Sequence, residues 1–218
     1  DMIEKILIAN RGEIAVRIIR ACREMGIRTV AVYSEADRDA LHTQLADEAV
    51  CIGPAPSTDS YLNMQNIISA TLVSGADAIH PGFGFLSENS RFARLCEQCN
   101  IVYIGPPSDV ISRLGNKSEA RNTMIKAGVP VIPGSKEAVY DVKEGAKIAK
   151  KIGYPVIIKA ALGGGGKGMR VAQNPEEFEQ SFQTARKEAG IAFGDETTYM
   201  EHFGKNLRHI ELQILADN

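Results

Sequence analysis

Short apolar runs alternate with amphipathic stretches of helical spacing through residues 1–105. Apolar runs of this kind are typical of strands buried on both faces, and the stretches between them are long enough for crossover helices. The pattern therefore predicts an α/β domain with a parallel, doubly wound sheet. The expected strands are 6–9, 29–33, 49–52, 76–80 and 101–104. The expected helices are 12–25, 61–74 with Ser60 as its N-cap, and 88–98 with Ser87 as its N-cap.

A second pattern follows a helical stretch at 108–126. The proline-rich segment 129–134 breaks that stretch and predicts a domain boundary. Beyond it, helices are expected at 141–151 and 175–189, and strands at 154–161, 169–172, 197–203 and 209–216. The last of these strands alternates as if one face were buried, yet the sequence stops soon after it. We therefore expect the remainder of a further domain beyond this sequence.

Charge and hydropathy exclude several function classes. The chain has 25 Lys+Arg against 27 Asp+Glu and a pI near 6.1, so it lacks the basic footprint of a nucleic-acid-binding protein. No apolar run is long enough to cross a bilayer, and residues 1–10 have no basic leader. The four cysteines include Cys96 and Cys99 at redox or zinc spacing, but no second pair or nearby histidine completes a site. We expect buried thiols and a cytoplasmic location.

The turn after the first strand does not fit a dinucleotide site. Such a site needs three glycines, and only Gly12 is present between Ala9 and Ala15. The segment Gly163–Gly168 is a stronger phosphate candidate, because consecutive glycines leave backbone N–H groups unobstructed. It is not a Walker A loop, since Ala161 replaces the first glycine and Gly168 follows Lys167. A strand follows it, which predicts a hairpin that folds over phosphates; a surface hairpin without a ligand is the alternative.

Three further segments carry candidate groups. Lys159 ends an apolar strand, where a charge is costly unless an anion pairs with it, and we expect that anion to be phosphate. Lys117 starts a helix, and alone it would be read as a solvated lysine. Residues 199–204 could offer backbone groups to an adenine edge, with Glu201 accepting from an exocyclic amine or a sugar hydroxyl. The loop 80–89 follows a strand, where parallel sheets bind ligands. His202 and His209 lack Cys or carboxylate neighbours at metal-ligating spacing, and His42 is expected to be a solvated helix residue.

Together these segments resemble biotin carboxylase, the ATP-grasp component of biotin-dependent carboxylases. The resemblance extends along the whole chain and is greatest to the bacterial subunit of acetyl-CoA carboxylase. It rests on residues 8–15, 35–39, 45–54, 80–89, 153–160, 163–169 and 208–211. It implies a Rossmann-like N-terminal domain at 1–115, a helical connector at 116–130, an ATP-grasp lid at 131–204, and the first strand of a catalytic domain at 205–218.

The resemblance also implies an activity and its residues. ATP and bicarbonate would give carboxyphosphate, whose CO₂ carboxylates biotin on a biotin carboxyl carrier protein, the first half-reaction of acetyl-CoA carboxylase in fatty acid synthesis. Lys117 and Lys159 would contact ATP phosphates, Gly165 and Gly166 would lie in the mobile lid, and His209 would lie near the ribose. The adenine hinge would be Glu201, His202, Phe203 and Gly204. Many members carry Tyr at the position of Phe83 near the biotin site.

The remaining parts of the activity would lie elsewhere. The Mg²⁺ or Mn²⁺ ligands, the bicarbonate- and biotin-binding arginines and the catalytic base of the family all fall beyond residue 218, so we expect this chain alone to be inactive. Implied partners are carboxyltransferase subunits and a second copy of the chain. The alternatives are the corresponding part of a pyruvate or propionyl-CoA carboxylase, another ATP-grasp ligase, or a stand-alone nucleotide-binding module.

Overall fold

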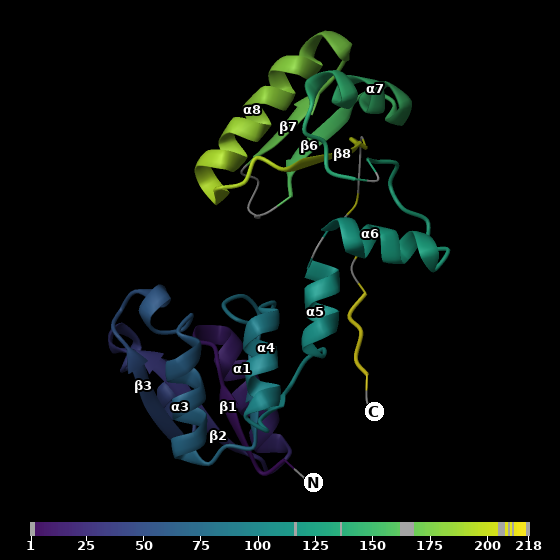
Figure 1. The fold of residues 1–218 in the computed structure, drawn as a ribbon. Coiled ribbons are helices and arrows are strands. Elements are labelled where there is room, and N and C mark those ends of the chain that lie inside the picture. Colours follow the sequence, from purple (N-terminus) through teal and green to yellow (C-terminus); the bar gives the residue numbers. More distant parts are fainter. Residues whose placement is uncertain are drawn as a thin grey trace. The chain divides into compact units, whose positions relative to one another are not determined.

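The chain is represented by a computed structural model with two compact units (Figure 1), one ending at Gly115 and the other beginning at residue 116. The structure describes residues 3–115, 117–135, 137–161, 168–204, 208, 210 and 212–216, without the side chains of Lys117, Ser118 and Phe193.

The first unit is built on a five-stranded parallel sheet, as the alternating pattern predicted. Its strands lie in the order β3-β2-β1-β4-β5, so the chain winds outward from β1 in both directions. The strands are β1 (Lys5–Ile8), β2 (Arg28–Ser34), β3 (Glu48–Gly53), β4 (Ala78–His80) and β5 (Val102–Tyr103). All four pairings are parallel, which confirms the doubly wound prediction.

Helices cover both faces of this sheet. Leu7 packs into one buried cluster with residues from α3 and α4, whereas Ile6 and Ile8 pack into another with residues from α1. This division follows from the alternation of side chains along a strand. The helices are α1 (Gly12–Glu24), α2 (Leu41–Leu45), α3 (Met64–Ser74), α4 (Ser90–Gln98) and α5 (Ser108–Gly115), with 3₁₀ turns at Glu35–Asp37 and Ser57–Asp59.

The structure corrects three local expectations in this unit. The helices α3 and α4 begin later than predicted, because Asn63 and Asn89 cap them in place of Ser60 and Ser87; each Asn side chain accepts a hydrogen bond from an N–H three residues on. His42 lies in a helix, α2, as expected, but it is fully buried and not solvated, with Nε2 3.0 Å from the carbonyl oxygen of Val32.

The second unit is a small antiparallel sheet covered by helices on one face (Figure 1). Its strands lie in the order β7-β6-β8, and the hairpin of β6 and β7 matches the strand–loop–strand prediction. Val156, Ile158 and Met200 face α7 and α8 and pack with Phe178 and Phe182. The elements are α6 (Lys117–Lys126), α7 (Val142–Ile152), β6 (Val156–Ala160), β7 (Met169–Ala172), α8 (Pro175–Phe193) and β8 (Thr198–His202).

The strand expected at 209–216 is absent from the described part of this segment, residues 210 and 212–216. Its apolar side chains remain exposed, Leu212 at 86% and Ile214 at 82%. A strand forms only with a hydrogen-bonded neighbour, and the described residues supply none for this segment. The alternating pattern is therefore present in the sequence without the sheet that it would join.

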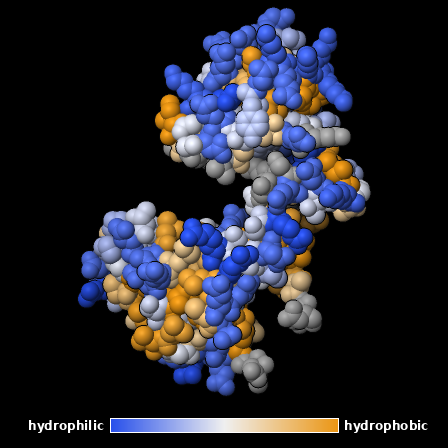
Figure 2. All heavy atoms as spheres, in the orientation of Figure 1, coloured by the Kyte–Doolittle hydropathy of each residue, from blue (hydrophilic) through white to orange (hydrophobic). Residues whose placement is uncertain are grey.

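The surface is mixed in character. Figure 2 shows hydrophilic residues over the visible face of the second unit and an apolar area over α3, where Leu72 and Val73 are exposed. Within the described ranges, no helix combines the length and the hydropathy required to span a bilayer.

Candidate functional site

The strongest candidate site is the face of the β7-β6-β8 sheet that does not pack against helices. Register pairs Lys159 with Met169 on one side and with Tyr199 on the other, and it pairs Ile157 with Val171 and Glu201. Because side chains alternate along each strand, these six lie on the face opposite Ile158 and Met200. All except the buried Tyr199 are partly exposed. The face thus combines apolar side chains suited to a planar ring with one cation and one carboxylate.

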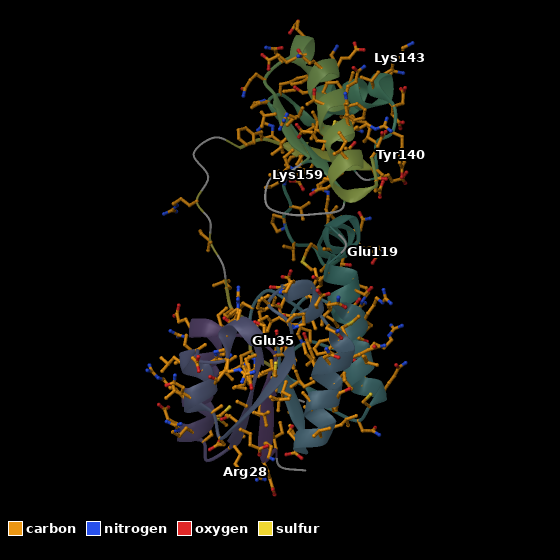
Figure 3. All side chains as sticks on the ribbon, turned by 90° about the vertical axis from the view of Figure 1, so that its left-hand side faces the viewer. Arg28, Glu35, Glu119, Tyr140, Lys143 and Lys159 are labelled. Atoms are coloured by element: carbon orange, nitrogen blue, oxygen red, sulfur yellow. The ribbon has the colours of Figure 1, made fainter. Side chains whose placement is uncertain are left out.

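Lys159 does have an anionic partner, and that partner is Glu201. The Nζ atom of Lys159 lies 2.5 Å from Oε2 of Glu201 and 5.9 Å from the centroid of the Tyr199 ring. Both side chains of the ion pair are largely buried, at 25% and 20% exposure. Burial, reinforced by the Glu201 carboxylate, raises the pKa of Tyr199. Figure 3 shows Lys159 in the second unit.

The predicted adenine hinge forms an ordered edge beside this pair. The N–H of His202 donates to the carbonyl of Pro133 at 2.8 Å, and the N–H of Phe203 donates to that of Pro155, also at 2.8 Å. Nδ1 of His202 lies 3.0 Å from the carbonyl oxygen of Gly153. Two of the hinge N–H groups are therefore used within the protein, and the expected N–H contact to adenine cannot come from His202 or Phe203 while these bonds persist.

The segment before α7 lines the other side of β8. The N–H of Ser135 donates to the Met200 carbonyl at 2.8 Å, and the N–H of Met200 donates to the Ser135 hydroxyl oxygen at 3.0 Å. Gly134 and Glu201 form an isolated antiparallel β-bridge. A Cβ atom on Gly134 would lie 2.6 Å from the Met200 carbonyl oxygen and 3.1 Å from Cγ of Glu201, so only glycine fits. Arg121 of α6 donates to the carbonyl of Ile132, and its buried Nε has no partner among the described groups.

The glycine-rich segment is described only at its end. Gly168 has a φ of +67°, and a Cβ there would lie 2.9 Å from Cβ of Ala160, so the loop must close on glycine. Gly165, Gly166 and His209 lie outside the described residues, and Lys117 is described only as the first residue of α6. Of the sequence-predicted site residues, the structure thus brings together Lys159 and Glu201. His202 is the last residue of β8, and Phe203 and Gly204 follow it.

In the first unit, the carboxyl ends of β1 and β4 meet at the loop 80–89. The Asn10 side chain, only 2% exposed, holds this loop by donating to the carbonyls of Pro81 and Phe83 at 2.8 and 2.7 Å. Gly82 has a φ of +62°, and a Cβ there would lie 2.7 Å from Ile14. The opening turn therefore positions the loop 80–89, which leaves the ring of Phe83 71% exposed.

A polar cluster supports the same loop. The Arg11 guanidinium lies 5.4 Å from the Tyr61 ring and 5.7 Å from the Phe85 ring, which stack on each other. Asp37 accepts from the Tyr61 hydroxyl at 2.6 Å and from Arg11 at 3.2 Å. Burial raises the pKa of the Asp37 carboxyl, but these hydrogen bonds and the nearby guanidinium outweigh it and hold that pKa below its ordinary value.

The described residues offer no redox or metal centre. Burial raises the pKa of the Cys96 thiol to about 12, so it is a poor nucleophile at neutral pH, in keeping with the predicted buried thiol; Cys99 is partly exposed. No cluster of three or more His, Cys, Asp or Glu capable of holding a metal occurs within the described ranges.

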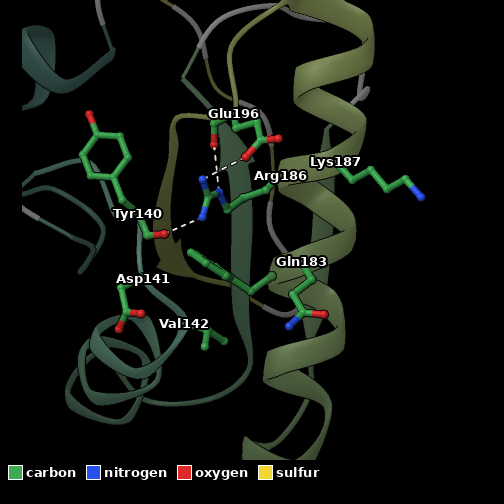
Figure 4. Close-up of a pocket in the computed structure, with 8 residues that line it drawn as sticks. Tyr140, Asp141, Val142, Gln183, Arg186, Lys187 and Glu196 are labelled. Carbon is green, nitrogen blue, oxygen red and sulfur yellow. Dashed lines mark hydrogen bonds and ion pairs between the residues drawn. The ribbon is translucent and has the colours of Figure 1, made fainter.

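A hollow of about 320 Å³ lies on the helix side of the second unit, between the start of α7 and α8 (Figure 4). Arg186 crosses it, donating to the carbonyl of Tyr140 and to Glu196, and its guanidinium lies 5.9 Å from the Phe182 ring. These groups already occupy the guanidinium, so Arg186 does not offer its charge to a ligand in this arrangement.

Sequence reasoning missed the apolar members of the open face, Ile157, Met169 and Val171. A usable signal was present, because residues two apart share a strand face and Lys159 had already been assigned a ligand. No comparable signal links Lys159 with Glu201, since their contact depends on the register between β6 and β8.

Comparisons with known proteins give matches to both units of the chain. Residues 2–111 match the family model of the biotin carboxylase N-terminal domain, and residues 116–218 match that of the carbamoyl-phosphate synthase L chain ATP-binding domain. Biotin carboxylase 1 of Bacillus subtilis is 59% identical over 217 residues, which cover 100% of this chain and 48% of that protein. Biotin carboxylase of Nostoc is 59% identical over 215 residues, which cover 99% of this chain and 48% of that protein.

Solved structures give the same relationship. A biotin carboxylase complex with β,γ-ATP from Campylobacter jejuni superposes with a TM-score of 0.89 at 52% identity, covering 94% of this chain and 46% of that one. A second structure is the biotin carboxylase domain of the 2-oxoglutarate carboxylase of Hydrogenobacter thermophilus, with MgADP and bicarbonate. It superposes with a TM-score of 0.86 at 50% identity, covering 93% of this chain and 45% of that one. The chain thus spans about half the length of the relatives that it matches.

Proposed function

Because this chain belongs to the biotin carboxylase family, we propose that the protein containing it carboxylates biotin on a carrier protein, using ATP and bicarbonate through carboxyphosphate. The observation that carries the proposal is the open sheet face of the second unit. There Lys159, near the end of β6, precedes the glycine-rich segment in the sequence and lies diagonally across from the hinge residue Glu201.

In this proposal each part of the second unit has a role toward ATP. Lys159 and Lys117 contact phosphates as point charges, and Gly165 and Gly166 cover the phosphates from the hairpin. Residues 201–204 form the adenine hinge, the apolar face of Ile157, Met169 and Val171 packs on the base, and His209 lies near the ribose. Closure of residues 131–204 as a lid, with 116–130 as its connector, would exclude water and protect the activated intermediate from hydrolysis.

We assign biotin to the loop 80–89 of the first unit, the Rossmann-like domain of residues 1–115. In support, Asn10 and the Arg11–Asp37–Tyr61 cluster hold this loop at the carboxyl edge of the sheet, where α/β proteins place ligands. Phe83 presents an apolar ring there and cannot supply the phenolic hydrogen bond that a Tyr would offer. This difference predicts weaker recognition of biotin polar atoms at that position.

Divalent metal chemistry does not fit the described residues, which hold no suitable carboxylate cluster. We propose that Mg²⁺ or Mn²⁺ is held by a part of the protein beyond residue 218, in the domain that residues 205–218 begin. Such a cation neutralises phosphate charge during phosphoryl transfer, so the 218-residue chain alone should not turn over ATP.

The acetyl-CoA carboxylase assignment is a further proposal. It rests on the likeness of residues 35–39 and 45–54 to the bacterial subunit, and it implies a cytoplasmic enzyme of fatty acid synthesis. Its partners would be a biotin carboxyl carrier protein, carboxyltransferase subunits and a second copy of the chain. The observation that favours another carboxylase is a match to pyruvate carboxylase of Rhizobium etli, with a TM-score of 0.80 at 45% identity.

Nucleotide binding by Lys159 variants of the full-length protein tests the phosphate site. Lys159→Ala should weaken ATP binding by roughly tenfold or more, because a charge-assisted contact of ~1.5–3 kcal/mol is lost. Lys159→Arg should rescue binding only in part, since the guanidinium keeps the charge but changes its reach. If both variants bind ATP as the parent does, the phosphate role is wrong.

A further inference from the structure

The ion pair of Lys159 and Glu201 places a carboxylate where the proposed function needs a free cation. The two residues lie diagonally on neighbouring strands, with Nζ and Oε2 2.5 Å apart. Only 25% and 20% of the two side chains is exposed, so solvent screens this contact less than it would an exposed pair. A phosphate approaching Lys159 therefore encounters a neutralised ammonium and a nearby negative charge.

The backbone of Glu201 is fixed on both sides. It pairs with Ile157 of β6 on one side and bridges Gly134 on the other, and the N–H of the next residue donates to Pro133. The stem of Glu201 also lies against Gly134, where a Cβ would come within 3.1 Å of its Cγ. With the backbone held in this way, separation of the pair requires rotation of the Lys159 or Glu201 side chain.

We propose that Glu201 is an internal counter-ion of Lys159 and that it lowers the affinity of this site for every phosphate-bearing ligand. Resting on the proposed function, the inference is that the ammonium passes from the Glu201 carboxylate to a phosphate when a nucleoside triphosphate binds. The carboxylate lowers the affinity for any anion, including inorganic polyphosphates. A nucleotide overcomes this competition because its base also contacts the open sheet face, whereas a bare polyphosphate has no such contact. The carboxylate thus lowers the affinity for bare polyphosphate and for nucleotide alike, and the contacts of the base with the sheet face decide between the two ligands.

The test measures binding of three probes to the full-length protein by calorimetry: inorganic tripolyphosphate, ATP and adenosine. The variant is Glu201→Gln, which keeps the shape of the side chain and removes its charge. We expect tripolyphosphate and ATP each to bind about tenfold tighter and adenosine to change by less than about twofold, since only phosphate-bearing ligands meet the carboxylate. Glu188→Gln is the matched control, because it removes an α8 carboxylate that is paired with Arg170 of β7. It should leave all three affinities unchanged.

The alternative role for Glu201 gives the opposite result. If its carboxylate accepts a hydrogen bond from adenine or ribose, Glu201→Gln should weaken adenosine and ATP by a similar factor, and this outcome overturns the proposal. An unchanged affinity for tripolyphosphate overturns it as well. Should Glu201→Gln fail to fold, Glu201→Asp keeps the charge but withdraws it by one methylene, and it should tighten tripolyphosphate binding to a smaller extent. Absence of ATP binding by the unmodified protein would instead refute the proposed function.

Discussion

Replacing Asn10 by Asp should destabilise the first unit severely although the two side chains have almost the same shape. The Asn10 amide donates to the carbonyls of Pro81 and Phe83 at 2.8 and 2.7 Å, and its oxygen accepts from the N–H of Arg11 at 2.9 Å. The third bond survives in the variant. The first two become contacts between a carboxylate oxygen and two carbonyl oxygens, in a site that is only 2% exposed.

The magnitude follows from those two contacts. Each lost hydrogen bond costs about 1 kcal/mol, and each carbonyl left facing an acceptor adds about 1–3 kcal/mol, partly relieved if the loop moves away. We therefore expect a loss of about 3–6 kcal/mol, which is a large part of the ~5–15 kcal/mol that stabilises a typical domain. The backbone amides of the loop 80–89 should also exchange faster with solvent, because these bonds join the loop to the turn after β1.

Urea unfolding followed by circular dichroism, with amide hydrogen exchange over residues 81–89, measures both effects. The control is Asn63→Asp, the same chemical change at the N-cap of α3, where only the oxygen is seen to be used. Aspartate caps a helix as well as asparagine does, so the control should change stability by less than about 0.5 kcal/mol. If Asn10→Asp costs no more than this control, Asn10 does not hold the loop in the way the structure indicates.

Three further predictions concern the second unit and the acid range. Gly134→Ala should separate residues 133–135 from β8, because its Cβ would lie 2.6 Å from the Met200 carbonyl oxygen; faster amide exchange at Met200 and His202 checks this, and unchanged exchange would contradict it. Phe178→Ala, at a ring that is 1% exposed and stacked on Phe182, should cost about 3–5 kcal/mol in urea unfolding, whereas a loss below about 1 kcal/mol would mean that this core repacks. The pKa of Asp47 is lowered in the folded chain, first by the N–H of Thr29, so its contribution to stability is present above the unfolded pKa and is lost as pH falls through the folded pKa. The urea concentration at the unfolding midpoint should therefore decrease as pH drops below about 4, and it should decrease less steeply in Asp47→Asn. The same pH dependence in the parent and the variant would contradict the assignment.

The sequence predicted the fold well where the signal is local. Apolar runs located all five strands of the parallel sheet, and Asn174 followed by Pro175 marked the start of α8. Helix starts were less accurate, because Ser60 and Asn63 are both acceptable N-caps and only packing selects between them. The burial of His42 was not predictable, because α2 has too few residues for its buried face to be visible in the sequence, so this helix residue was assigned to solvent.

The candidate site was predictable only where its signal is local in the sequence. Lys159 could be identified because a charge at the end of an apolar strand needs a partner, but the identity of that partner depends on strand register. The strand expected at 209–216 shows the opposite limit: its alternation is clear in the sequence, yet strand formation requires a neighbour that the described residues do not provide.

Bicarbonate-dependent release of ADP by the full-length protein, with free biotin as acceptor, tests the central claim most directly. The account predicts ADP release that requires bicarbonate, rises with biotin and falls at least tenfold in Lys159→Ala, while the 218-residue chain alone shows none. ADP release that is independent of bicarbonate, or turnover by the 218-residue chain alone, would contradict the account.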